Sequence, residues 1–183
     1  MIEDELLKIR FKCGDPKALR LIYDKYRDFL LTLAMQFLNE ADLAEDVVHD
    51  VFVGLAQSQD TFKIRGNLKG FLAVCVVNRM RDQLRSRKRQ SARRQDHYST
   101  DGAVEAPLHR LISDEQSRQV AEALAQLSNE QREVLVLHLN AQMKFREIAT
   151  RLNVPFSTVR GRYRHGLDRL RSILNGRIDH DTD

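Results

Sequence analysis

The chain has 183 residues, of which 42% are hydrophobic, and it contains no Trp, 3 Pro and 8 Gly. This composition fits one domain or two small ones with real cores, and the two distant cysteines give no disulfide framework. Because the N-terminus is acidic and no long uninterrupted apolar run exists, we expect neither a signal peptide nor a membrane span, and we predict a cytoplasmic protein.

The net charge of +4 is modest, but the charges are segregated along the chain. Residues 28–62 contain seven acidic side chains and no Lys or Arg. Residues 79–94 contain eight basic side chains and one acid, and residues 151–171 form a second basic cluster with Asp168 as its one acid. Such segregation indicates surfaces with different partners, although ordinary solvated helix faces remain the alternative.

The first 90 residues have helical periodicity. Asp15 is a good N-cap with Pro16 at the first helical position, and an apolar stripe follows as far as Phe37. A second helix starts near residues 39–42 and carries its acids opposite its apolar face. Residues 60–67 form a loop, after which a third helix is apolar through residue 77 and then strongly basic.

Residues 90–113 lose this periodicity and collect Ser, Asp, Gly and Pro, which places a domain boundary there. Helical patterns resume after Ser113, and Ser128 with Gln131 fits a capping box. We therefore predict an all-α protein with two small helical domains joined by a flexible linker. The predicted segments are an N-terminal bundle, a linker, a C-terminal helix-turn-helix domain and a disordered tail, at residues 1–90, 91–113, 114–176 and 177–183.

Enzyme signatures are missing, because the chain has no phosphate-binding glycine loop, no H-E-x-x-H and no G-x-S-x-G. Glu45, Asp46 and Asp50 share one acidic helix turn, but no ligand from elsewhere converges on them. We predict a protein that is not an enzyme and that needs neither a metal nor a cofactor.

The segment FREIATRLNVPFSTVRGRYRHGLDRL, residues 145–170, has the layout of a helix-turn-helix. Asn153 falls at the turn, where a left-handed backbone is needed, and Val154 closes the corner. Arginines on the second helix have almost no acids beside them, which favours a DNA major groove over a merely solvated face. The basic run at residues 78–89 similarly favours a phosphate backbone, and the loop at 61–67 could hold an unstacked base.

Taken together, these segments resemble a sigma factor of bacterial RNA polymerase, from the sigma-70 family and its extracytoplasmic-function (ECF) group. DLAEDVVHDVFVGL resembles the family's D-A-E-D-L-V-Q-E-V-F element, which docks on the clamp helices of the largest polymerase subunit. NLKGFLAVCVVNRMRDQLRSRKR resembles the helix that reads and opens the −10 element. Residues 128–174 resemble the family's −35-binding domain.

The resemblance implies three sets of contact residues. The polymerase-facing patch is expected at Asp42, Glu45, Asp46, His49, Asp50 and Phe52. Contacts with the −10 element are expected at Lys63, Arg65, Asn67, Asn78, Arg79, Asp82, Arg85, Arg87 and Lys88. Contacts with the −35 element are expected at Thr158, Arg160, Gly161, Arg162, Arg164, His165 and Arg169.

The implied partners are core RNA polymerase, through the clamp helices and the flap on the −35 side, promoter DNA, and an anti-sigma factor. The chain departs from the family pattern at His49, Val77, Pro155 and Gly161, positions that bear on polymerase contact and promoter sequence. Two alternatives stay open: a helix-turn-helix regulator that binds DNA without core polymerase, and a sigma-like decoy that binds polymerase or a regulator without directing initiation.

Overall fold

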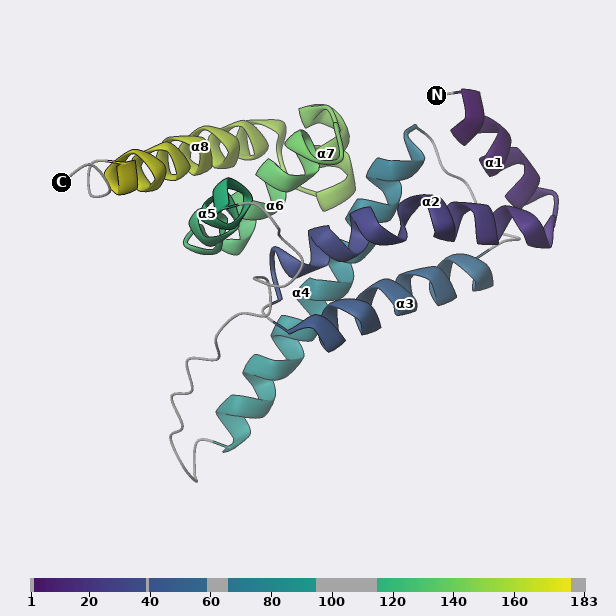
Figure 1. Cartoon of the computed structure of the whole chain (residues 1–183), viewed down its shortest axis with the longest axis horizontal. Helices are drawn as coiled ribbons and strands as arrows, with labels where there is room; N and C mark the ends of the chain where they lie inside the picture. Colours follow the sequence, from purple (N-terminus) through teal and green to yellow (C-terminus); the bar gives the residue numbers. More distant parts are fainter. Residues whose placement is uncertain (1, 39, 59–65, 95–114, 179–183) are drawn as a thin grey trace.

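The computed structural model describes residues 2–38, 40–58, 66–94 and 115–178, which form eight α-helices and no strand. The all-α prediction is therefore confirmed for the described part of the chain. Figure 1 shows α1–α4 and α5–α8 as two groups lying side by side. The helices are α1 (Ile2–Lys12), α2 (Pro16–Met35), α3 (Ala41–Gln57), α4 (Leu68–Arg94), α5 (Glu115–Ala125), α6 (Asn129–Leu139), α7 (Phe145–Leu152) and α8 (Phe156–Ile178).

The N-terminal half is a bundle of α2, α3 and α4, with α1 packed on α2. The Asp15 carboxylate accepts a hydrogen bond from the backbone N of Lys17 at 2.9 Å, and Pro16 opens α2, as the sequence predicts. Asp4 anchors α1 by accepting hydrogen bonds from Lys25 Nζ at 2.8 Å and from Tyr26 Oη at 2.7 Å. These contacts fix α1 beside the bundle.

The C-terminal half is built on α6, which packs against α8 and begins at the predicted capping box of Ser128 and Gln131. Asn153 ends α7 in the left-handed conformation, with φ 53° and ψ 49°. The backbone N of Val154 donates to the carbonyl of Ala149 at 3.0 Å, which closes the turn before α8. The helix-turn-helix prediction is confirmed.

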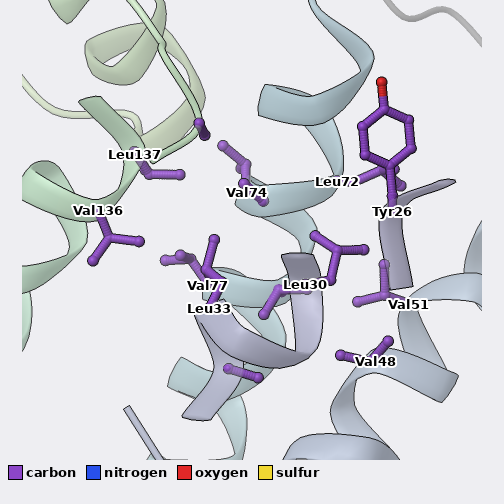
Figure 2. Close-up of a cluster of buried hydrophobic side chains, with 14 of the residues drawn as sticks. Tyr26, Leu30, Leu33, Val48, Val51, Leu72, Val74, Val77, Val136 and Leu137 are labelled. Atoms are coloured by element: carbon purple, nitrogen blue, oxygen red, sulfur yellow. The ribbon is translucent and has the colours of Figure 1, made fainter. Parts of the chain in front are cut away.

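The two halves also pack against each other, which the sequence did not predict. In Figure 2, Val136 and Leu137 of α6 face Val74 and Val77 of α4, and all four side chains belong to one buried apolar cluster. The helix α4 continues past residue 90 to Arg94. The predicted linker beyond Arg94, including Ser113, lies outside the described residues, as do tail residues 179–183.

Candidate polymerase and DNA interfaces

The acidic side of α3 is a solvent-facing surface. Val47, Val48 and Val51 turn one side of α3 into the bundle, so the residues between them face outward. Of the six residues predicted to face polymerase, four are exposed and Asp50 is half-buried; the exposed ones are Asp42, Glu45, Asp46 and His49. A hollow of about 260 Å³ lies beside them, lined by Tyr23, Arg27, Leu31, Glu45, Asp46, Val48 and His49.

Phe52 does not belong to this surface. It is 6% exposed and packs edge-on against the ring of Tyr23, with ring centres 4.8 Å apart. Its spacing places it on the apolar side of α3 with Val48 and Val51, and its contact with a partner stays a prediction. Tyr23, its ring partner, lines the hollow beside the acidic surface.

Two acids at the α3 side of the bundle bind arginines of α4. Arg79 donates to Asp50 Oδ2 through Nε at 2.9 Å and through Nη2 at 2.5 Å. Arg87 donates to both carboxylate oxygens of Glu40, at 2.8 and 3.0 Å, and this hydrogen bonding lowers the pKa of Glu40 and raises that of Arg87. Both arginines are predicted to contact DNA. In the folded chain, each of them already binds a carboxylate.

The groove between α3 and α4 is a candidate site for base capture. A hollow of about 570 Å³ there has apolar walls that include Val51, Phe71 and Leu72, with Asn78 and Asp82 among its polar residues. The Cys75 thiol also lines it, and burial raises the pKa of that thiol to about 11, so it is neutral at physiological pH. A hollow with these walls can accept a flat, uncharged ring and hydrogen-bond its edge.

The remaining residues predicted to contact the −10 element fall into three groups. Asn78, Asp82 and Arg85 are exposed on α4. Asn67 accepts from the backbone N of Lys69 at 2.9 Å and donates to the carbonyl of Ala141 at 3.3 Å, so its amide already has two partners. Lys63 and Arg65, and the side chain of Lys88, lie outside the described residues.

The second helix of the helix-turn-helix presents a basic face. Val159 is fully buried, and Gly166 lies so close to α6 that a Cβ there would sit 3.0 Å from Leu135 Cδ1. The residues of the predicted −35 set are exposed or half-buried; they are Thr158, Arg160, Gly161, Arg162, Arg164, His165 and Arg169. A Cβ at Gly161 would meet nothing within 4 Å, so the backbone there is open to a close approach.

A cluster of three aromatic rings connects α8 to α6 and α7. The ring centres of His138, Phe145 and Tyr163 lie 4.3 to 5.0 Å apart, and the carbonyl of Met143 lies 2.8 Å from Nδ1 of His138. These contacts tie the start of α7 to the middle of α8 and the end of α6. The orientation of the basic face is therefore fixed by packing.

Sequence reasoning missed Arg132 and Glu133, two buried charged residues on α6. Glu133 accepts hydrogen bonds from Arg81 of α4, whereas Arg132 donates from Nη1 to the carbonyl of Gln36 at 3.0 Å, in the segment after α2. Burial lowers the pKa of Arg132. The sequence shows two adjacent charged residues, Arg132 and Glu133, within the apolar pattern of α6. It does not indicate which residues they contact.

Both helical halves of the chain match known protein families. Residues 22–90 match the family model of Sigma-70 region 2, and residues 123–172 match that of Sigma-70, region 4. The RNA polymerase sigma-H factor of Pseudomonas aeruginosa is 26% identical over 169 residues, which cover 87% of this chain and 88% of that protein. The ECF RNA polymerase sigma factor SigW of Bacillus subtilis is 26% identical over 172 residues, covering 89% and 92%.

Solved structures share the fold. The sigma factor RpoE in complex with the anti-sigma factor NepR from Bartonella quintana gives a TM-score of 0.63 at 24% identity, over 84% of this chain and 98% of that one. CnrH in complex with the cytosolic domain of CnrY gives 0.69 at 24% identity, over 94% and 97%. In the part of the chain that the structure describes, no helix is both long and apolar enough to cross a bilayer.

A chain with a region 2 match on its first helical half and a region 4 match on its second belongs to the sigma-70 family of RNA polymerase sigma factors. The relative SigW carries the name of the extracytoplasmic-function group within that family.

Proposed function

We propose that this protein directs core RNA polymerase to specific promoters and stabilises their melted state, with the acidic face of α3 as its polymerase-binding surface. The support is the exposure of Asp42, Glu45, Asp46 and His49 on one side of a helix whose other side is buried. Such a face is complementary to a basic partner surface, and charge complementarity speeds and orients association. The clamp helices of the largest polymerase subunit are the proposed partner.

The groove between α3 and α4 binds the non-template strand of the −10 element in this proposal. An unstacked base enters the hollow, with Asn78 and Asp82 at its polar edge, while Arg85 contacts the backbone. Since this groove accepts only a base that has left the duplex, binding energy is gained in the melted state alone. The equilibrium therefore shifts toward strand separation without any nucleotide hydrolysis by this chain.

The helix α8 binds the −35 duplex in the major groove. Its N-terminal half carries Arg160, Arg162 and Arg164, which can reach guanine edges and phosphates, and none of them forms an ion pair with another described residue. Phosphate contacts set the position of the helix, and base-edge contacts supply the specificity.

The protein is, in this proposal, a non-catalytic subunit that acts in the cytoplasm, where it meets polymerase and DNA. The flap on the −35 side of polymerase is a second contact, made by the C-terminal half. Solved relatives form complexes with the anti-sigma factor NepR and with the cytosolic domain of CnrY, and we propose that this chain is held by a partner of the same kind.

One observation carries the function: a single chain combines an exposed acidic helix face with two separate basic surfaces. A plain helix-turn-helix regulator would leave α3 and α4 without a task, and a decoy would leave α8 without one. The test is reconstitution with core polymerase and a promoter pool, followed by run-off transcription. Specific transcripts are expected. Tight core binding without transcripts would favour the decoy, and DNA binding without core binding would favour the regulator.

A further inference from the structure

The outer face of α1 is an apolar stripe in contact with solvent. It carries the three most exposed large apolar side chains in the part of the chain that the structure describes: Ile2 at 89%, Ile9 at 59% and Leu6 at 53%. Their spacing of four and three residues places them on one face of the helix. Cys13 is exposed and extends this face, because its backbone N still donates to the carbonyl of Ile9 at 2.9 Å. Single exposed apolar residues are ordinary, whereas a continuous row of them is typical of an interaction surface. These four residues are called the α1 stripe below.

The opposite face of α1 is held against the bundle, so the stripe cannot turn inward. Leu7 and Phe11 are buried, and Lys8 Nζ donates to the carbonyl of Gly66 at 2.9 Å. Figure 1 shows α1 at the edge of the molecule, beside the first turns of α2. Because the helix is already folded and fixed, a binding partner does not have to order it, which removes one of the main entropic penalties of association.

Charged residues flank the stripe on both sides and repeat after seven residues. They are Glu3 and Arg10 on one flank, and Glu5 and Lys12 on the other. Arg10 is half-buried and the other three are exposed. On each flank, an acid therefore stands one heptad before a base. An apolar stripe at positions a and d, with charges at e and g, is the pattern by which two helices pair side by side.

The charges of α1 match a second α1 only when the two helices run in opposite directions. In that orientation each flank lies against the same flank of the copy, reversed. Glu3 then faces Arg10 of the second copy, and Glu5 faces Lys12. Within the stripe, Leu6 faces Ile9 and Ile2 faces Cys13. A parallel pair would instead place Glu3 beside Glu5 and Arg10 beside Lys12, and like charges across an interface are unfavourable.

We propose that the α1 stripe is a self-association surface, at which two copies of this chain pair antiparallel to form a reversible dimer. This inference goes beyond the proposed function and does not depend on it. The helix has 11 residues and is about 16 Å long, so the interface is small and the dimer dissociates readily. Glu3 and Glu5 already bind Lys25 and Lys8 within the chain, so the flanking charges select the orientation more than they add affinity.

The first experiment measures self-association of the full chain by sedimentation velocity between about 1 and 300 μM. The weight-average mass should rise toward that of a dimer. Leu6→Gln with Ile9→Gln should raise the dissociation constant at least about tenfold, because the dimer loses four apolar contacts. The matched control is Val120→Gln with Leu139→Gln, which changes two exposed apolar residues of α5 and α6 and should leave the constant within about twofold.

Two outcomes of this experiment overturn the proposal. One is a parent protein that stays monomeric over the whole concentration range. The other is an equal loss of association in the α1 variant and in the control. If the parent is monomeric and the α1 variant binds core polymerase more weakly, the stripe is covered by polymerase and not by a second copy.

The second experiment tests the charge pairing. Lys12→Glu places an acid opposite Glu5 of the second copy, so it should raise the dissociation constant at least about threefold at low salt and less at high salt. Arg171→Glu makes the same change in net charge at an exposed position of α8 and should have a smaller effect. Equal effects of the two variants would mean general charge repulsion and would overturn the antiparallel pairing.

The third experiment fixes the register by disulfide formation. Ile2→Cys should form a covalent dimer on mild oxidation, because the new thiol faces Cys13 of the second copy. Within one chain these positions are 11 residues apart, about 16 Å along the helix, which is too far for a disulfide. The parent protein, and Ile2→Cys with Cys13→Ser, should stay uncross-linked, although both retain Cys75. A covalent dimer of the parent through Cys13 would show a parallel pair, and either that result or the absence of a bond in Ile2→Cys overturns the proposed arrangement.

Discussion

The ion pair between Asp50 and Arg79 links the proposed polymerase surface to the proposed −10 surface. The Asp50 side chain is 38% exposed and that of Arg79 is 48% exposed, so water screens the pair and it stabilises the fold by at most about 1 kcal/mol. Asp50→Asn should therefore leave the free energy of unfolding within about 1 kcal/mol of the parent value. Its effects on binding should be larger and of opposite sign at the two surfaces.

Binding of polymerase should weaken in Asp50→Asn, because one negative charge leaves the acidic face of α3. Binding of a −10 non-template oligonucleotide should strengthen by up to about fivefold. The reason is that Arg79 no longer has to break an ion pair with Asp50, which contributes about 1 kcal/mol. The released arginine should also make the dependence of affinity on salt steeper by about one phosphate contact. Fluorescence anisotropy at several salt concentrations measures both quantities.

Asp46→Asn is the matched control. Asp46 is exposed on the same face of α3, and it forms no ion pair with another described residue. It should weaken polymerase binding and leave oligonucleotide affinity unchanged. If Asp50→Asn and Asp46→Asn change oligonucleotide affinity equally, the Asp50 carboxylate does not restrain Arg79, and the link between the two surfaces is refuted.

Three further predictions follow from single contacts. Arg160→Ala should cost about 1–3 kcal/mol at the preferred −35 site and relax preference at one base pair in a binding-site selection; uniform weakening across all sequences would mean a phosphate contact instead. Arg87 lowers the pKa of Glu40, so Glu40→Gln should be less stable than the parent protein at neutral pH. This difference should disappear in acid, when the pH falls below the lowered pKa and Glu40 of the parent is protonated. Urea midpoints of the two proteins that differ equally at pH 7 and in acid would contradict this. Gly166→Val should lower the unfolding free energy by about 1–3 kcal/mol through its clash with α6, whereas Gly161→Ala, in open space, should raise it by up to about 1 kcal/mol in the same thermal melts.

Local sequence signals predicted the helices well. The caps at Asp15 and Ser128 are short-range hydrogen bonds, and the left-handed turn at Asn153 depends on that residue and its neighbours. Helical periodicity also placed the acids of α3 on an exposed face. The same periodicity puts the ring of Phe52 in the core with Val48, whereas the resemblance expects Phe52 among the polymerase-facing residues.

The fold class, the order of the two halves and the segregation of acidic and basic surfaces are predictable from the amino-acid sequence, because these depend on residues that are close along the chain. Which charges bind one another depends on how the helices pack. Arg79 and Asp50 are 29 residues apart, and Arg81 and Glu133 are 52 apart. No periodic pattern connects such positions. Their pairing, and with it the packing of α4 on α6, therefore follows from the tertiary arrangement of the helices.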